Sequence, residues 1–223
     1  MIINQLKSKL SLKWLLDGYD LKKKYEELAN ILLNEVVIKK GECLYWITDI
    51  EFYLYTPKHK DIITYPRNCE AGQWFFHNSG VDISFESKVG TAVKEKTKKR
   101  MAHLTEDSAF GGILIKAIEP AWVEDSKDGA ITDLKGPQKL CDELFDMFDA
   151  FGNADNFPQL AIANNKRNND PKSAVRHNLL PKGKTEEKID SILANHYYGS
   201  DIEKDDLVKA FDSYLSAKYR FHI

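Results

Sequence analysis

The chain has 223 residues, of which 43% are hydrophobic and 30% charged, and its formal net charge is −2. This composition excludes a disordered, a collagen-like or a membrane-spanning protein, and the length allows one large domain with a modest appendage. The near-zero net charge gives no overall electrostatic field that would attract a polyanion. The three cysteines are widely spaced, which predicts neither disulfides nor a zinc site and favours a reducing, cytoplasmic location.

The chain opens with two segments whose apolar residues recur at helical spacing. These segments cover residues 3–16 and 20–32, with Gly18 between them and Asp20 as the cap of the second. We therefore expect two amphipathic helices, with residues 1–26 forming a helical appendage.

The clearest strand signal follows. Residues 35–38 and 43–55 are rich in β-branched and aromatic side chains and flank a tight turn, which predicts a β-hairpin. Alternation along the second strand places apolar side chains on one face and polar ones on the other. The apolar set is Trp46, Ile50, Phe52 and Leu54, and the polar set is Asp49, Glu51, Tyr53 and Tyr55. By pattern alone, the polar face is the solvated face of an antiparallel sheet.

Three more strands are predicted beyond the loop at 56–71. Residues 72–77 and 81–85 indicate two short strands joined by a turn, which carry His77 and Asp82. Residues 111–118 form a continuous apolar run, typical of a strand buried on both faces.

Lys116 lies inside that apolar run. Burying an unpaired ammonium there would destabilise the folded state. We therefore expect the Lys116 side chain to be largely buried and paired with a carboxylate, either Glu51 or Asp82.

The C-terminal half is less regular. A helix is expected to begin at Gly136-Pro137, because proline suits the first helical position, and a closing amphipathic helix is expected around residues 204–219. Residues 151–184 indicate a long surface excursion. The expected organisation is a core at 27–150 and a C-terminal segment, 151–223, packed on it.

The usual catalytic signatures are missing. The sequence has no phosphate-binding loop, dinucleotide-binding glycine turn, HExxH, CxxC pair or G-x-S-x-G elbow, which argues against the enzyme classes that carry them. What remains is the carboxylate and aromatic set on the long strand, with His77 and Asp82 on neighbouring strands. A lone histidine in an aromatic strand is more often structural, so both interpretations stay open.

Four segments, in order and spacing, resemble the landmarks of the alkyladenine (3-methyladenine) DNA glycosylase family. They are LANILL at 28–33, ITDIEFY at 47–53, GILIKAIEP at 112–120 and GPQKLC at 136–141. The resemblance covers about residues 27–148.

This resemblance implies an α+β fold, a single domain with a curved antiparallel sheet and flanking helices, similar to glycosylases and to formyltransferase C-terminal domains. It implies a pocket for a base flipped out of DNA and hydrolysis of its N-glycosidic bond without a metal or cofactor. Glu51 falls on the family's general base and Lys116 on its arginine. Tyr53 and Phe85 fall on the two aromatics that stack on the base.

The resemblance leaves the position of one further pocket residue open. The family's pocket histidine falls on Tyr65 or on the nearby His59, and the pattern does not choose between them. His77 and Asp82 are expected to contact the substrate.

The segment 86–110 bears on DNA binding. Between 88 and 100 it holds six basic residues, which form either a solvated face or a phosphate-contacting surface. It has no aromatic residue between Phe85 and Phe110, so we expect no hairpin of the kind that carries the family's aromatic wedge. The expected partner is DNA, bound weakly through phosphates, or a nucleobase-type ligand, by a monomer and without a membrane.

Three functions therefore compete. The first is a divergent glycosylase-like hydrolase with Glu51 as general base. The second is a catalytically inactive module on the same fold that binds nucleic acid or a small ligand. The third is an unrelated hydrolase or transferase that uses Glu51, His77 and Asp82 together.

Overall fold

The computed structural model describes residues 2–18, 20–93, 100–121, 134–146, 148, 156–177, 184–198 and 203–223. The helices in these ranges are α1 (Ile2–Lys9), α2 (Leu12–Leu16), α3 (Leu21–Asn34), α4 (Pro137–Leu144), α5 (Thr185–His196) and α6 (Lys204–Ser216). The strands of the first half are β1 (Val36–Lys40), β2 (Cys43–Thr56), β3 (His59–Lys60), β4 (Trp74–His77), β5 (Gly80–Ser84), β6 (Gly90–Val93) and β7 (Arg100–His103). Those of the second half are β8 (Phe110–Pro120), β9 (Leu134–Lys135), β10 (Gln159–Ile162), β11 (Lys172–Ala174) and β12 (Arg220–His222).

The centre of the fold is an antiparallel sheet built on the two long strands β2 and β8. Within the described ranges it has ten strands, with the main order β10-β1-β2-β8-β5-β4. Three short strands attach to the long ones: β3 and β12 pair with β2, and β9 pairs with β8. The protein is therefore of the α+β class.

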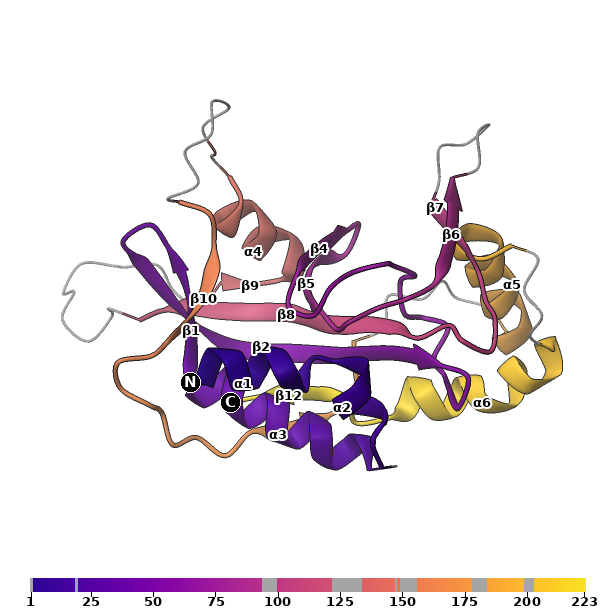
Figure 1. Ribbon diagram of the computed structural model, residues 1–223, viewed down its shortest axis with the longest axis horizontal. Coiled ribbons are helices and arrows are strands. Elements are labelled where there is room, and N and C mark those ends of the chain that lie inside the picture. The colour runs from indigo at the N-terminus through magenta and orange to yellow at the C-terminus, as the bar shows by residue number, and fades with distance from the viewer. Residues whose placement is uncertain are drawn as a thin grey trace.

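Helices cover both sides of this sheet (Figure 1). The N-terminal helices α1, α2 and α3 lie along one side of β2 and β8, α4 lies on the other side, and α5 and α6 lie at one end. Leu6, Leu10 and Leu15, from the segment expected as an appendage, are buried in the same hydrophobic cluster as Phe52 of β2. None of the described helices is both long and apolar enough to cross a membrane.

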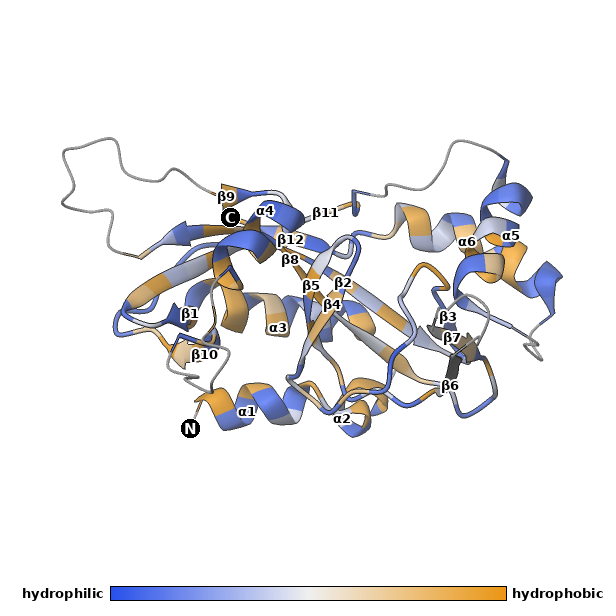
Figure 2. Ribbon diagram, turned by 90° about the horizontal axis from the view of Figure 1, so that it is seen from above, coloured by the Kyte–Doolittle hydropathy of each residue, from blue (hydrophilic) through white to orange (hydrophobic). Residues whose placement is uncertain are grey.

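The helices are amphipathic, with hydrophilic and hydrophobic residues interspersed along their length (Figure 2).

A second hydrophobic cluster explains why α5 and α6 pack at one end of the sheet. It joins Tyr55 and Phe110, whose rings stack with centroids 5.0 Å apart, to Ile189 of α5 and Phe211 of α6.

The alternation expected along β2 is wrong at one point, because the strand contains an irregularity. Its register against β8 shifts between Ile47 and Asp49 and again between Asp49 and Ile50. Ile47 therefore shares the main core with Ile50, while Trp46 packs in a separate small cluster. A strict period of two across this bulge misplaces Trp46.

The opposite face of β2 is not the solvated face that the pattern indicates. Glu51 and Tyr55 are both 0% exposed. C-terminal segments cover this face: residues of α5 and α6 pack in one hydrophobic cluster with Tyr55, and the chain just after β11 reaches Glu51 through a hydrogen bond from the backbone of His177. Residues far along the chain thus convert an apparently wet face into an enclosed one.

The segment 86–110 contains an antiparallel pair of short strands. It has no aromatic residue between Phe85 and Phe110, and the expectation that it carries no aromatic wedge stays a prediction. The strands β6 and β7 pair antiparallel, with Gly90 opposite His103 and Val93 opposite Arg100. Ala102 and Leu104 are buried in the second cluster and hold the pair against the body. Residues 94–99, with most of the basic run, lie outside the described residues.

Candidate functional site

A cavity of about 310 Å³ opens between the β2–β8 pair, the loop after β3, the β4–β5 turn, the start of α4 and the helix α5. Six of the seven site residues expected from the sequence line it: Glu51, Tyr53, Tyr65, His77, Asp82 and Lys116. Further lining residues not expected from the sequence include Arg67, Gln138, His177 and His196. Its volume is at the lower end for ligand cavities, so it suits a small molecule or one base.

Glu51 is a carboxylate of this cavity whose two oxygens are both bound by the protein. Its Oε2 accepts a hydrogen bond from the Tyr53 hydroxyl at 2.7 Å, and its Oε1 accepts one from the backbone N–H of His177 at 2.7 Å. Glu51 and Tyr53 share a face because they are two residues apart on β2.

Lys116 supplies the countercharge. Its ammonium lies 3.7 Å from Glu51 Oε1, and its side chain is only 13% exposed. The expected burial and pairing of Lys116 is confirmed, with Glu51 as the partner.

The Tyr53 hydroxyl is fixed as a donor. Burial raises the pKa of Tyr53 well above its ordinary value, and the Glu51 carboxylate raises it further. The phenol therefore remains protonated and donates to Glu51.

Behind Tyr53 lies a buried ion pair that anchors the chain beside Glu51. Arg176 Nη1 donates to Asp61 Oδ2 at 2.7 Å and to the Phe52 carbonyl at 3.1 Å, and Nη2 donates to the Tyr214 carbonyl. Both charged side chains are fully buried. Arg176 directly precedes His177, so this anchor fixes the backbone N–H that Glu51 accepts.

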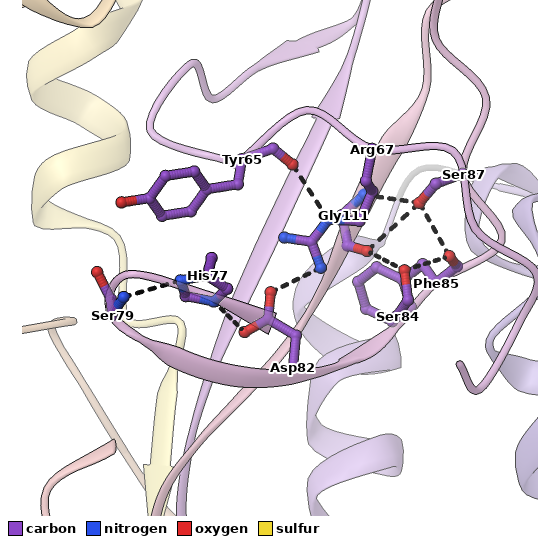
Figure 3. Close-up of polar contacts among 9 residues, drawn as sticks. All are labelled: Tyr65, Arg67, His77, Ser79, Asp82, Ser84, Phe85, Ser87 and Gly111. Atoms are coloured by element: carbon purple, nitrogen blue, oxygen red, sulfur yellow. Dashed lines mark hydrogen bonds and ion pairs between the residues drawn. The ribbon is translucent and has the colours of Figure 1, made fainter. Parts of the chain in front are cut away.

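Asp82 forms a second buried network on the opposite wall. Arg67 Nη1 lies 2.6 Å from Asp82 Oδ2, and His77 Nε2 lies 2.9 Å from Oδ1. Figure 3 shows Arg67 and His77 reaching the carboxylate from different sides. Burial alone would raise the pKa of Asp82, but the Arg67 guanidinium and the His77 hydrogen bond outweigh it, so the pKa is lowered. The carboxylate therefore stays ionised.

Both ring nitrogens of His77 are occupied. Its Nδ1 accepts the backbone N–H of Ser79 at 3.2 Å, so the proton is on Nε2 and is donated to Asp82. The ring stacks on Tyr65 with centroids 4.6 Å apart, and His196 meets Tyr65 edge-on. His77 is thus a wall of the cavity whose two ring nitrogens both make hydrogen bonds within the protein.

The expectation that Phe85 stacks on a ligand is wrong. Phe85 is fully buried in the main core, where its ring lies parallel to that of Phe52 at 6.5 Å. Alternation explains this, because Asp82 faces the cavity and Ile83 and Phe85 therefore face the core. Figure 3 shows the Phe85 ring well apart from Tyr65 and His77.

Of the two residues that could take the place of the family's pocket histidine, Tyr65 and His59, only one lies at the cavity. Tyr65 lines the cavity. His59 is buried elsewhere, where Nδ1 donates to the Leu54 carbonyl at 2.7 Å and Nε2 accepts from the Tyr219 hydroxyl at 3.0 Å. Burial lowers the pKa of His59, which keeps its ring neutral.

Among the described residues, no group of three or more His, Cys, Asp and Glu side chains is arranged to hold a metal ion. The site is instead a carboxylate with an adjacent ammonium, facing aromatic and imidazole walls. Neither models of protein families nor curated proteins match this sequence, so its function is argued from the geometry of this site.

Proposed function

We propose that this chain has a divergent glycosylase-like fold, binds a single base flipped from a nucleic acid and hydrolyses its N-glycosidic bond, with Glu51 as general base. The observation that carries the proposal is the placement of Glu51. Its side chain is 0% exposed yet lines a cavity, and both of its oxygens are oriented by the protein. A buried, oriented carboxylate in a cleft is a common feature of catalytic sites.

The reaction suits this arrangement. As the bond between C1′ and the base nitrogen breaks, its electron pair leaves with the base and positive charge develops on the sugar. The Glu51 carboxylate stabilises that charge and accepts a proton from the water whose oxygen adds to C1′. The hydrogen bonds to Glu51 occupy one lone pair on each oxygen and leave another free for the water.

The opposite wall would hold the base. Tyr65 and His77 line this wall with their rings stacked on each other, and stacking of a base on an aromatic ring contributes about 1–3 kcal/mol. That contribution is comparable to the few kcal/mol that extruding a base costs. Lys116, as a point charge, balances Glu51 without the forked geometry of an arginine.

We further propose that its partner is DNA, which it binds weakly through the phosphates. The protein would act as a monomer in the cytoplasm. Its three cysteines are all free, which suits a reducing compartment.

A second candidate is an inactive module that binds the same kind of ligand. One observation favours it: the Glu51 side chain is 0% exposed and both of its oxygens already accept hydrogen bonds from the protein, which restricts the access of a water molecule to it.

Glu51→Gln distinguishes the two candidates. The amide keeps the shape but removes the base, so single-turnover release of base from an alkylated oligonucleotide should fall at least about 1,000-fold, with binding nearly unchanged. Glu42→Gln, in the exposed β1–β2 turn, is the matched control and should keep the wild-type rate. Equal rates in wild type and Glu51→Gln would remove Glu51 as the catalyst. Binding without turnover in the wild type would favour the inactive module.

A further inference from the structure

His177 contacts Glu51 through its backbone, and the proposed reaction does not use its side chain. Its backbone N–H lies 2.7 Å from Glu51 Oε1, and the residue lines the same cavity. Its position is set by Arg176, the preceding residue, whose guanidinium is buried and bonded to Asp61. The backbone from which the His177 imidazole extends is therefore fixed beside the Glu51 carboxylate.

The orientation of the imidazole is set from the other side by Arg220. Arg220 Nη1 lies 2.9 Å from His177 Nε2. A guanidinium can only donate hydrogen bonds, so Nε2 is the acceptor and the ring proton is on Nδ1. The contact thus selects one tautomer of a neutral imidazole.

Arg220 is itself fixed. Its Nε donates to Asp49 Oδ1 at 2.9 Å and its Nη2 donates to Oδ2 at 2.6 Å, a two-pronged contact. The hydrogen bond to Asp49 also raises the pKa of Arg220 above its ordinary value, so the guanidinium stays charged. Pairing of β12 with β2 creates this arrangement, because Arg220 lies opposite Glu51 in the register.

We propose that His177 is a second functional residue, a fixed hydrogen-bond donor whose Nδ1–H contacts an acceptor on the bound base. The chain Asp49–Arg220–His177 orients the donor, and the Arg220 charge behind it strengthens its attraction for developing negative charge. Among the described residues, none accepts a hydrogen bond from Nδ1, and this proton is assigned to an acceptor on the ligand.

This assignment deepens the proposed hydrolysis and rests on it. When the bond from C1′ to the base breaks, the electron pair passes to the base, and the Nδ1–H of His177 stabilises the base as it leaves. His177 keeps its proton throughout, and the water proton still goes to Glu51. A neutral imidazole polarised in this way acts as an electrophile and not as a proton donor.

The first test needs no turnover. Imidazole ¹⁵N spectra of the wild-type protein should show His177 with a protonated Nδ1 and an unprotonated Nε2. Free 3-methyladenine is then the probe, and its ring nitrogens are acceptors, so its addition should shift the Nδ1 resonance. In Arg220→Met the ring loses its orienting donor, because the thioether has no N–H, so both tautomers should be populated and the shift on adding the base should shrink.

The opposite results overturn the assignment. A proton on Nε2 in the wild type would contradict the orientation by Arg220. An Nδ1 resonance that does not respond to 3-methyladenine would exclude His177 as the ligand donor, whether or not the protein turns over substrate.

Kinetics provide the second test. His177→Ala keeps the backbone N–H to Glu51 but removes the donor, so the single-turnover rate constant should fall roughly 100-fold with substrate affinity changed less than about threefold. His177→Asn, whose amide nitrogen approximates Nδ1, should recover about tenfold of that loss. His222→Ala, on the same strand as Arg220 but outside the cavity lining, is the control.

These tests separate the two proposals. An Nδ1 shift without turnover would retain His177 as the ligand donor and reject the hydrolysis. Turnover that is equal in wild type and His177→Ala would retain the hydrolysis and reject the role of His177.

Discussion

The carboxylate of Asp82 uses both of its oxygens within the protein, one toward Arg67 and one toward His77. Both side chains of the Asp82–Arg67 pair are nearly inaccessible to solvent. A buried pair of this kind adds little net stability compared with apolar packing, but removing one partner leaves an uncompensated charge. The network therefore fixes the shape of the cavity wall more than it stabilises the fold.

The Asp82→Asn substitution should expose this dependence. At pH 7 it leaves Arg67 buried without a countercharge, so the free energy of unfolding should fall by about 3–5 kcal/mol. Because the pKa of Asp82 is lowered in the folded state, its contribution is present above about pH 4 and is lost as the pH falls further.

The measurement is urea unfolding of both proteins at pH 7 and at about pH 3. The wild type should lose its advantage at the lower pH, while the exposed control Asp170→Asn should match the wild type at both. A stability difference that stays constant with pH would show that the carboxylate charge is not what matters.

At the scale of the elements, the close approach of β8 to β2 is what places Lys116 next to Glu51. Two adjacent glycines make it possible. A Cβ on Gly111 would lie 2.2 Å from the Tyr53 carbonyl oxygen, and one on Gly112 would lie 2.7 Å from Arg67 Nη1. The glycine pair therefore accommodates a neighbouring backbone at one position and a buried guanidinium at the next.

Gly111→Ala should force the two long strands apart next to Tyr53. We expect a loss of about 1–3 kcal/mol in the free energy of unfolding, because backbone atoms cannot move aside as a flexible side chain can. Chemical denaturation measures it. The control is Gly18→Ala, where a Cβ meets nothing within 4 Å and only the positive φ of +75° is unfavourable. If Gly111→Ala is no more destabilising than Gly18→Ala, the close approach is not a constraint.

Elements with a strong local pattern could be predicted from the sequence. The helix α3, the β1–β2 and β4–β5 hairpins, β8, α4 and α6 form close to the expected residues, whereas the single helix expected at 3–16 is divided into α1 and α2. The strands β10, β11 and β12 are short and depend on distant partners, so no local period marks them. The pattern therefore indicates only a surface excursion at residues 159–162 and 172–174, where the structure has β10 and β11.

The candidate site divides in the same way. Glu51 and Tyr53 could be recognised because they are in phase on one long strand, and Lys116 because it interrupts an apolar run. Arg67 and His177 lie in irregular segments and come close to the others only through tertiary structure. The pair Gly111-Gly112 was the one local signal that something bulky approaches β8 closely.

At the scale of the whole molecule, the near-zero net charge bears on how a nucleic acid would be held. With a formal charge of −2, attraction must come from local basic residues, including the six between 88 and 100. Contacts of this type are made with phosphates and carry no sequence or lesion information.

We therefore expect weak duplex binding that depends steeply on salt and selects poorly for a lesion. Fluorescence anisotropy across a NaCl series, with an alkylated duplex and its undamaged counterpart, measures both properties. The affinity for the two duplexes should fall in parallel as salt rises. Tight binding that prefers the alkylated duplex and is insensitive to salt would contradict this expectation.

The position of β12 also has a consequence for how the chain reaches its native state. This strand pairs with Asp49 to Glu51, and Arg220 lies 171 residues from Asp49 in the sequence. Closing so long a loop is slow, so a folding chain spends time with that edge of β2 unpaired. An open edge rich in aromatic and β-branched residues is a template for pairing between molecules.

Pairing of β12 with β2 should therefore reduce aggregation during refolding. Phe221→Ala removes a buried ring that packs edge-on against Phe52 and holds β12 in place. Light scattering during refolding should then rise more steeply with protein concentration than it does for the wild type, even in conditions where the native variant remains stable. If light scattering during refolding does not depend on protein concentration in either protein, the edge of β2 is covered early in folding.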